Sequence, residues 1–218
     1  MTSATSRAEE VKRLERGWWR RLPLILVRPE DVFAELRDGS EEQAEALSEP
    51  MVAVTILAGI AMFLSTATAG QLFDDPEFDW LLIAVEAFFA GVLVALQNYW
   101  LGGAALLLGL RCLRSPSHYR TARQIVGLST APFVLALFVV WPLRIAIFGA
   151  DLFHSGGSDE GTAGVALNVV DAVFVGWALV LAIVGIRTVE EWSLARAVGA
   201  TAFAATLFGL LLAAAIWA

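Results

Sequence analysis

The sequence is poor in the residues from which most soluble active sites are built. In 218 residues it has one cysteine, Cys112, two histidines and one lysine, Lys12. A single cysteine excludes an intramolecular disulfide and any cluster of cysteines around a metal. Only 17% of the residues are charged, whereas an average soluble domain has roughly 25%. These shortages exclude a disulfide-stapled secreted domain, a disordered tail and an ordinary soluble enzyme.

Long apolar runs take the place of the missing charge. Hydrophobic residues make up 58% of the chain, and the mean hydropathy is +0.68. The net charge of −7 makes a nucleic-acid partner an unlikely match for this chain. The first 20 residues are charged and contain no signal peptide, so the first membrane span is expected to direct insertion.

Five of these runs are long enough to cross a bilayer, which takes about 20 residues per helix. They cover about 51–70, 81–110, 124–149, 165–186 and 197–217. The second run would reach about 45 Å as one helix, beyond the ~30 Å hydrocarbon core. We expect it to tilt strongly, to bend near Gly102-Gly103 or to project from the membrane. The fold class is therefore an all-α, polytopic membrane helix bundle with five transmembrane helices.

Residues 1–50 precede the first predicted span and carry eight basic and eleven acidic side chains. Val11, Leu14 and Trp18 fall on one helical face, as in an interfacial helix. Further on, Val32, Phe33 and Leu36 give a second helix one apolar stripe after a Pro29 start. We expect a cytoplasmic, interfacial amphipathic region, either a solvated cap with an apolar face or a surface that docks a partner.

The charges of the connections alternate along the chain. The connections at 71–80 and 150–164 contain no Lys or Arg, whereas basic residues lie in the other two. These basic residues are Arg111, Arg114, Arg120, Arg123, Arg187 and Arg196. Because Lys and Arg favour the cytoplasmic side, we expect the N-terminus in the cytoplasm and the C-terminus outside. Tryptophans 80, 192 and 217 are expected at the membrane interface.

Three ionisable side chains fall within predicted spans: Glu86, Arg144 and Asp171. By position all three belong to the outer half of the bilayer, where Arg144 could pair with either carboxylate. Ionisable groups in a membrane mark functional sites by default. The two interpretations are a structural ion pair with a snorkelling arginine, and a proton or cation relay. We expect no catalytic, cofactor or metal site, because no such motif is present.

The last predicted span carries a face of small residues repeating every four positions. They are Ala197, Thr201, Ala205, Gly209 and Ala213. Small side chains let two membrane helices approach closely. This face is expected to pack within the bundle, and the alternative is a homo-oligomer.

Four stretches in order resemble the Yip domain family, five-span membrane proteins named for interacting with Rab-type GTPases. They are PEDVFAEL at 29–36, GLSTAP at 127–132, Trp177 with the following Gly185-Ile186-Arg187, and WSLARA at 192–197. Leu128 stands where the family prefers Tyr, and the eukaryotic Asp-Leu-Tyr-Gly-Pro motif has no counterpart. The resemblance implies a five-span fold and a membrane role, and the arginine-rich composition suggests a prokaryotic member.

Taken together, these features predict a non-enzymatic integral protein of the cytoplasmic membrane. It is expected to act as a scaffold or adaptor, with a cytoplasmic protein partner bound through residues 1–50. The alternative function is a small transporter or ion pathway that uses Glu86, Asp171 and Arg144. Besides the protein partner, the expected surroundings are the lipid bilayer and, in the homo-oligomer alternative, further copies of the chain.

Overall fold

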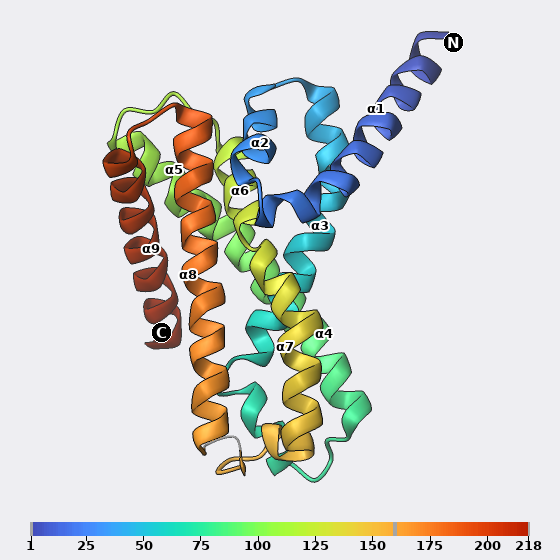
Figure 1. Cartoon of the computed structure of the whole chain (residues 1–218), viewed down its shortest axis with the longest axis vertical. Helices are drawn as coiled ribbons and strands as arrows, with labels where there is room; N and C mark the ends of the chain where they lie inside the picture. The colour runs from blue at the N-terminus through green and yellow to red at the C-terminus, as the bar shows by residue number, and fades with distance from the viewer. Residues whose placement is uncertain (1, 159–160, 218) are drawn as a thin grey trace.

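A computed structural model of the chain describes residues 2–158 and 161–217, with side chains over 9–158 and 161–214 (Figure 1). All regular structure in this part is helical, so the predicted all-α bundle is confirmed. The helices are α1 (Thr2–Arg21), α2 (Pro29–Ala34), α3 (Glu41–Leu64), α4 (Trp80–Gln97), α5 (Gly103–Cys112), α6 (Tyr119–Ser129), α7 (Ala131–Phe148), α8 (Thr162–Glu190) and α9 (Leu194–Trp217).

Five helical runs in the described chain are long and apolar enough to cross a membrane, as the sequence predicts. They are Glu41–Leu64, Trp80–Cys112, Tyr119–Phe153, Thr162–Glu190 and Leu194–Ala214. Successive runs point in opposite directions, so their connections gather at two ends of the bundle (Figure 1). We call the end with α1, α2, the 113–118 loop and the 191–193 turn the cap end. The opposite end, with 65–79 and 149–158, is the loop end.

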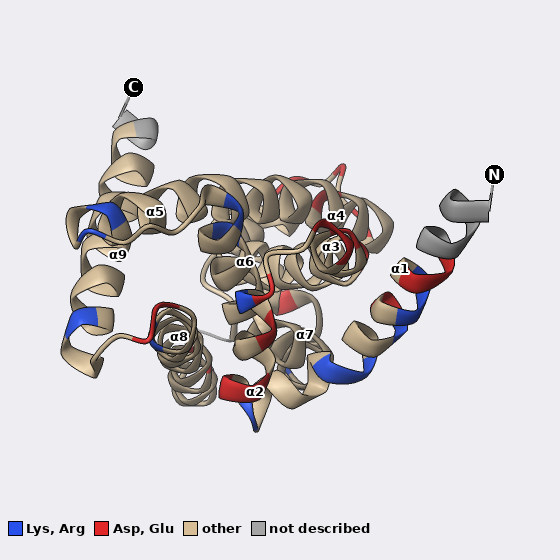
Figure 2. Ribbon diagram, turned by 90° about the horizontal axis from the view of Figure 1, so that it is seen from above, with Lys and Arg blue, Asp and Glu red and all other residues tan. Residues whose placement is uncertain are grey.

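The second run is a single helical passage made of α4, a π-helical turn at Asn98–Gly102, and α5. Its 33 residues would span about 50 Å if straight. It crosses the bundle obliquely, from α4 beside α3 to α5 beside α9 (Figures 1 and 2). The π turn ends at Gly102-Gly103, where the sequence predicts a bend. Tilt and a local change in helical winding together accommodate its length.

The first span begins ten residues earlier than the predicted start at about 51. Ser40 caps α3 by accepting a hydrogen bond from the Gln43 amide, and Glu41 and Glu42 occupy the favourable first turn. The helix ends at Leu64 and not near 70; at its C-cap the Ser65 hydroxyl donates to the Ala61 carbonyl oxygen. The charged start of α3 extends past the apolar part of the span, which hydropathy alone does not detect.

The third span is divided into two helices just before Pro132. α6 ends at Ser129 and α7 begins at Ala131, with Pro132 in the first turn of α7, where a missing amide proton costs nothing. Pro142 lies inside α7, which stays helical around it. The fourth and fifth spans begin three residues before their predicted starts, at Thr162 and Leu194.

Residues 22–37, which we call the inserted segment, pack their apolar face into the bundle core and leave the opposite face exposed. It comprises a 3-10 turn at Leu22–Leu26, α2 and a second turn at Glu35–Arg37. Ile25 and Phe33 are fully buried, and the predicted stripe of Val32, Phe33 and Leu36 faces the core. The boundary expected at residue 50 therefore divides one continuous hydrophobic core. Only α1 leads away from the bundle (Figure 1).

The closest helix contact is between α3 and α4, where backbone meets backbone at Gly59 and Gly91. A Cβ atom at Gly59 would collide with the Gly91 carbonyl oxygen and lie 2.8 Å from the Ala95 nitrogen. Such contact depends on glycine, as small-residue packing in membranes generally does. The three atoms nearest to a Cβ atom at Gly59 are two backbone atoms and the Ala95 Cβ, none of which belongs to a flexible side chain.

Replacing Gly59 with alanine is therefore expected to destabilise the protein by about 1–3 kcal/mol, the usual range for overpacking. The matched control is Gly176→Ala in α8, because a Cβ atom at Gly176 meets nothing within 4 Å. Unfolding of both variants by SDS titration would measure the difference. Equal stability of the two variants would contradict the close α3–α4 approach.

Candidate functional site

The most buried charged side chain in the described chain is Arg144 on α7, only 7% exposed. Its Nη2 atom donates to Asp171 Oδ2 at 2.8 Å and to Asn168 Oδ1 at 3.0 Å, both on α8. The guanidinium carbon also lies 5.4 Å from the centre of the Trp141 ring. Asp171 is better exposed than Arg144, with 22% of its side chain accessible. This ion pair links the two adjacent helices inside the membrane-spanning region.

The third ionisable candidate, Glu86, does not join this pair. It lies on the exposed face of α4, whose buried positions are Ile83, Ala87, Gly91 and Ala95. Of the two carboxylates that the sequence offers to Arg144, the structure brings Asp171 to it, because α7 packs along α8. Glu86 projects from the bundle surface that faces lipid.

The face of small residues on α9 is divided between two environments. Ala197 and Thr201 are buried near the cap end, where the Ala200 carbonyl oxygen closely approaches Gly109 of α5. Ala205, Gly209 and Ala213 are exposed farther along the helix. The first half of the face therefore packs within the bundle. Association with a second copy through the other half stays a prediction.

At the loop end, Asp74 joins the two connections. Its carboxylate accepts hydrogen bonds from the Ser155 hydroxyl and from the Ser155 amide, the latter at 3.0 Å. His154 Nδ1 lies 3.4 Å from the same carboxylate. The Ser155 hydroxyl bond, more than any other contact, lowers the pKa of Asp74 below its ordinary 3.8. The bonds favour the charged form.

This lowered pKa predicts a pH-dependent link between the loops. Because the folded-state pKa lies below the unfolded value, the stabilisation is complete above that value and disappears as pH falls through the lowered pKa. At about pH 4, pepsin should cleave the 65–79 and 149–158 loops faster in Asp74→Asn than in wild type. At about pH 2 the difference should vanish. Glu77→Gln, in the same loop, should cleave like wild type; a pH-independent effect of Asp74→Asn would contradict the interpretation.

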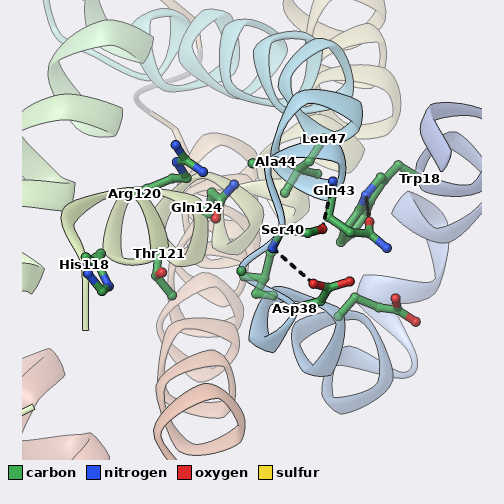
Figure 3. A pocket seen from close by; sticks show the side chains of 13 residues that line it. Trp18, Asp38, Ser40, Gln43, Ala44, Leu47, His118, Arg120, Thr121 and Gln124 are labelled. Carbon is green, nitrogen blue, oxygen red and sulfur yellow. Dashed lines mark hydrogen bonds between the residues drawn. The ribbon is translucent and has the colours of Figure 1, made fainter. Parts of the chain in front are cut away.

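The cap end holds a polar pocket of about 420 Å³. Asp38, Ser40, Gln43 and Ala44, from the turn into α3 and its first turns, lie across it from the α6 residues (Figure 3). The rest of its lining is Trp18, Glu35, Leu36, Gly39, Leu47, His118, Arg120, Thr121 and Gln124. Carboxylates of Glu35 and Asp38 thus line one part of the pocket, and His118 and Arg120 line another.

Several long-range bonds hold the walls of this pocket in place. Trp18 is 1% exposed and donates from Nε1 to Gln43 Oε1 at 3.2 Å, which fixes α1 against α3. Arg37 donates from Nε to the Thr188 carbonyl oxygen at 2.9 Å and pairs with Glu191 at 3.0 Å. A cation near the last carbonyls of α8 is favourable. The pocket is therefore built on rigid elements of the bundle.

A second charged site lies beside this pocket, in the first half of α6. Arg123 lies against three aromatic rings, with its guanidinium carbon 4.5 Å from the Trp100 ring centre, 5.4 Å from Tyr99 and 5.6 Å from Tyr119. Neither the pocket nor the aromatic rings around Arg123 are predictable from the sequence pattern. The sequence features related to these two sites are the helix-capping Ser40 and Tyr119. Neither feature indicates a site by itself, because each site is formed by contacts between distant segments.

Comparisons with known proteins give one match. The model of the Yip1 domain matches residues 24–216. No curated protein and no solved structure matches the chain. The matched region includes most of the inserted segment and all five membrane-spanning runs. The family predicted from the four sequence stretches is confirmed: the chain is an integral membrane protein that belongs to the Yip1 domain family.

Proposed function

We propose that this protein is a non-enzymatic membrane scaffold or adaptor that binds a segment of a cytoplasmic protein in its cap-end pocket. The observation that carries the proposal is the pocket itself, of about 420 Å³, with charged side chains of both signs on rigid walls. Pockets of about 300–1,000 Å³ with a few convergent polar groups are typical of binding sites. The inserted segment supports the pocket and is not itself the free docking arm.

The proposed location is the plasma membrane, with the cap end on the cytoplasmic side. Basic residues near the cap-end connections are Arg111, Arg114, Arg120, Arg123, Arg187 and Arg196. The described loop-end connections contain Asp74, Asp75, Glu77, Asp79 and Asp151 but no Lys or Arg. The positive-inside rule supports a cytoplasmic N-terminus and an external C-terminus on this basis.

The charges around the pocket define the chemistry of the partner. A basic side chain of the partner would meet Glu35 and Asp38, and an acidic one would meet Arg120. The partner is therefore a peptide segment with charges of both signs, and complementary charges supply its specificity.

Removing residues 1–50 is a poor test, because it also removes Trp18, Ile25 and Phe33 from the core. A better test captures partners of the full-length protein in mild detergent beside the variant Arg120→Glu. The matched control is Arg187→Glu, an exposed arginine at the same end but outside the pocket. We expect a partner that wild type and the control retain and Arg120→Glu loses. Equal capture by all three proteins would refute the pocket as its binding site.

The second candidate function is a small transporter or ion pathway, favoured by the buried Arg144–Asp171 pair. Buried charges of this kind mark ion and substrate pathways in many membrane proteins. Flux measured in proteoliposomes should then be lost in Asp171→Asn and kept in a folded control such as Gly176→Ala. Glu86 does not contact the Arg144–Asp171 pair. Glu86→Gln should therefore alter flux only if Glu86 takes part in a transport step that does not involve this pair. Unchanged flux in Asp171→Asn would remove this candidate.

A further inference from the structure

Two adjoining cavities lie between the spans, away from the cap end. The first, the mid-bundle chamber, has a volume of about 460 Å³ and a mainly apolar lining that includes Val94, Phe133, Phe174 and Phe208. The second, the loop-end chamber, has a volume of about 310 Å³ and lies where α3 ends. Both are lined by Ser65, Thr66 and Trp141, so they share a wall.

The loop-end chamber is rich in hydrogen-bond donors. Its lining includes Arg144, Gln71, His154 and Asn168, and no Asp or Glu is among its described lining residues. Two carboxylates contact this lining: Asp171, which itself lines the mid-bundle chamber, pairs with Arg144, and Asp74 lies beside His154. The lining residues themselves therefore offer hydrogen-bond donors and the Arg144 guanidinium, which suit an anion.

Arg144, which lines the loop-end chamber, has hydrogen-bond donors that are not used within the described protein. Both of its hydrogen bonds in the described chain come from Nη2, and its Nε atom is buried without a partner. A buried donor without a partner is uncommon and calls for a specific explanation, such as a bound group. A guanidinium presents a fork of donors that matches a phosphate group.

The order of the chambers along the bundle matches the polarity of a lipid molecule. The polar chamber is at the loop end, beside residues that follow α3, where headgroups of that leaflet lie. The apolar chamber lies deeper, beside the last turn of α4 and the middle of α8. A lipid in that leaflet has its phosphate and its acyl chains in the same order.

We propose that the two chambers together hold one anionic phospholipid. Its phosphate lies in the loop-end chamber near Arg144, and one acyl chain fills the mid-bundle chamber against Phe174 and Phe208. Asp171 neutralises part of the arginine charge and holds the guanidinium in place. A free phosphate would occupy only the loop-end chamber and leave the mid-bundle chamber without an occupant. The proposal is independent of the partner bound at the cap end.

The test is native mass spectrometry of the full-length protein titrated with phosphatidylglycerol or phosphatidylcholine carrying the same acyl chains. Wild type should retain phosphatidylglycerol at least about tenfold better, in line with the strength of hydrogen bonds between charged groups. The double variant Arg144→Gln/Asp171→Asn removes both charges together, so no unpaired charge remains, and it should lose this preference. Asp171→Asn alone should bind phosphatidylglycerol at least as well as wild type, because the competing carboxylate is gone.

Two further arms test the acyl chain and the source of the phosphate. Ala136→Phe places a ring in the mid-bundle chamber and should reduce retention of both lipids, whereas Ala202→Phe on the exposed face of α9 should not. Inorganic phosphate should not displace phosphatidylglycerol. Equal retention of the two lipids by wild type, normal retention by folded Ala136→Phe, or displacement by inorganic phosphate would each overturn the proposal. Circular dichroism and elution volume identify variants that fold.

Discussion

Replacing Phe33 with alanine is expected to lower the free energy of unfolding by about 3–5 kcal/mol, the usual cost of removing a buried aromatic ring. Phe33 is fully buried in the inserted segment, and its ring lies where a Cβ atom at Gly185 of α8 would come within 2.8 Å. The contact joins residues 152 positions apart in the sequence. Losing the ring leaves a cavity that α8, a long straight helix, cannot easily close.

The control for this prediction is Val27→Ala in the same segment, because the Val27 side chain is 72% exposed. Exposed substitutions usually change stability by less than about 0.5 kcal/mol. Thermal unfolding in detergent, followed by circular dichroism, would compare the two variants with wild type. If Phe33→Ala is as stable as Val27→Ala, the segment is an interfacial cap and not a part of the core.

The second large effect is expected at the intramembrane ion pair. Asp171→Leu leaves the Arg144 charge buried without its partner, and breaking a buried pair in this way costs about 3–5 kcal/mol. Asp171→Asn should cost less, since its amide oxygen can still accept from Nη2 of Arg144. SDS titration of both variants would measure the difference in free energy.

Glu86→Leu provides the contrast within the same protein. Glu86 also lies in a membrane span, but it is exposed on α4 and has no ion pair with Arg144. An apolar residue facing lipid should leave stability unchanged or raise it, because a charged side chain in the bilayer is costly. Loss of stability in Glu86→Leu that matches Asp171→Leu would contradict the assigned pairing.

The number of spans and their connections could be predicted, because hydropathy measures the property that makes a helix stable in lipid. The start of α3 could not, since Glu41, Glu42, Glu45 and Glu49 break the apolar pattern although the helix continues through them. The apolar stripe of the inserted segment could be predicted, but its burial in the bundle core could not. Its apolar run, Leu22–Val27, is too short to cross a bilayer, and its burial depends on packing against α8.

Individual candidate residues could be predicted from the sequence, but the contacts between them could not. A charge inside an apolar run is visible in the sequence, so Arg144 and Asp171 were predicted candidates. Which carboxylate reaches Arg144 depends on the rotation of α4 and α8 about their axes, which spacing along one helix does not define. The cap-end pocket joins residues 38–44 to residues 118–124, and no pattern within either segment reveals the other.

The central claim is that the cap-end pocket binds a protein segment, and photo-crosslinking from inside it is the most direct measurement. A photoreactive amino acid at Thr121, which lines the pocket, is compared in cells with one at Arg187 outside it. The account predicts one reproducible cross-linked protein from position 121, lost when Arg120→Glu is added, and absent from position 187. No cross-linked protein from position 121, or the same product from both positions, would contradict it.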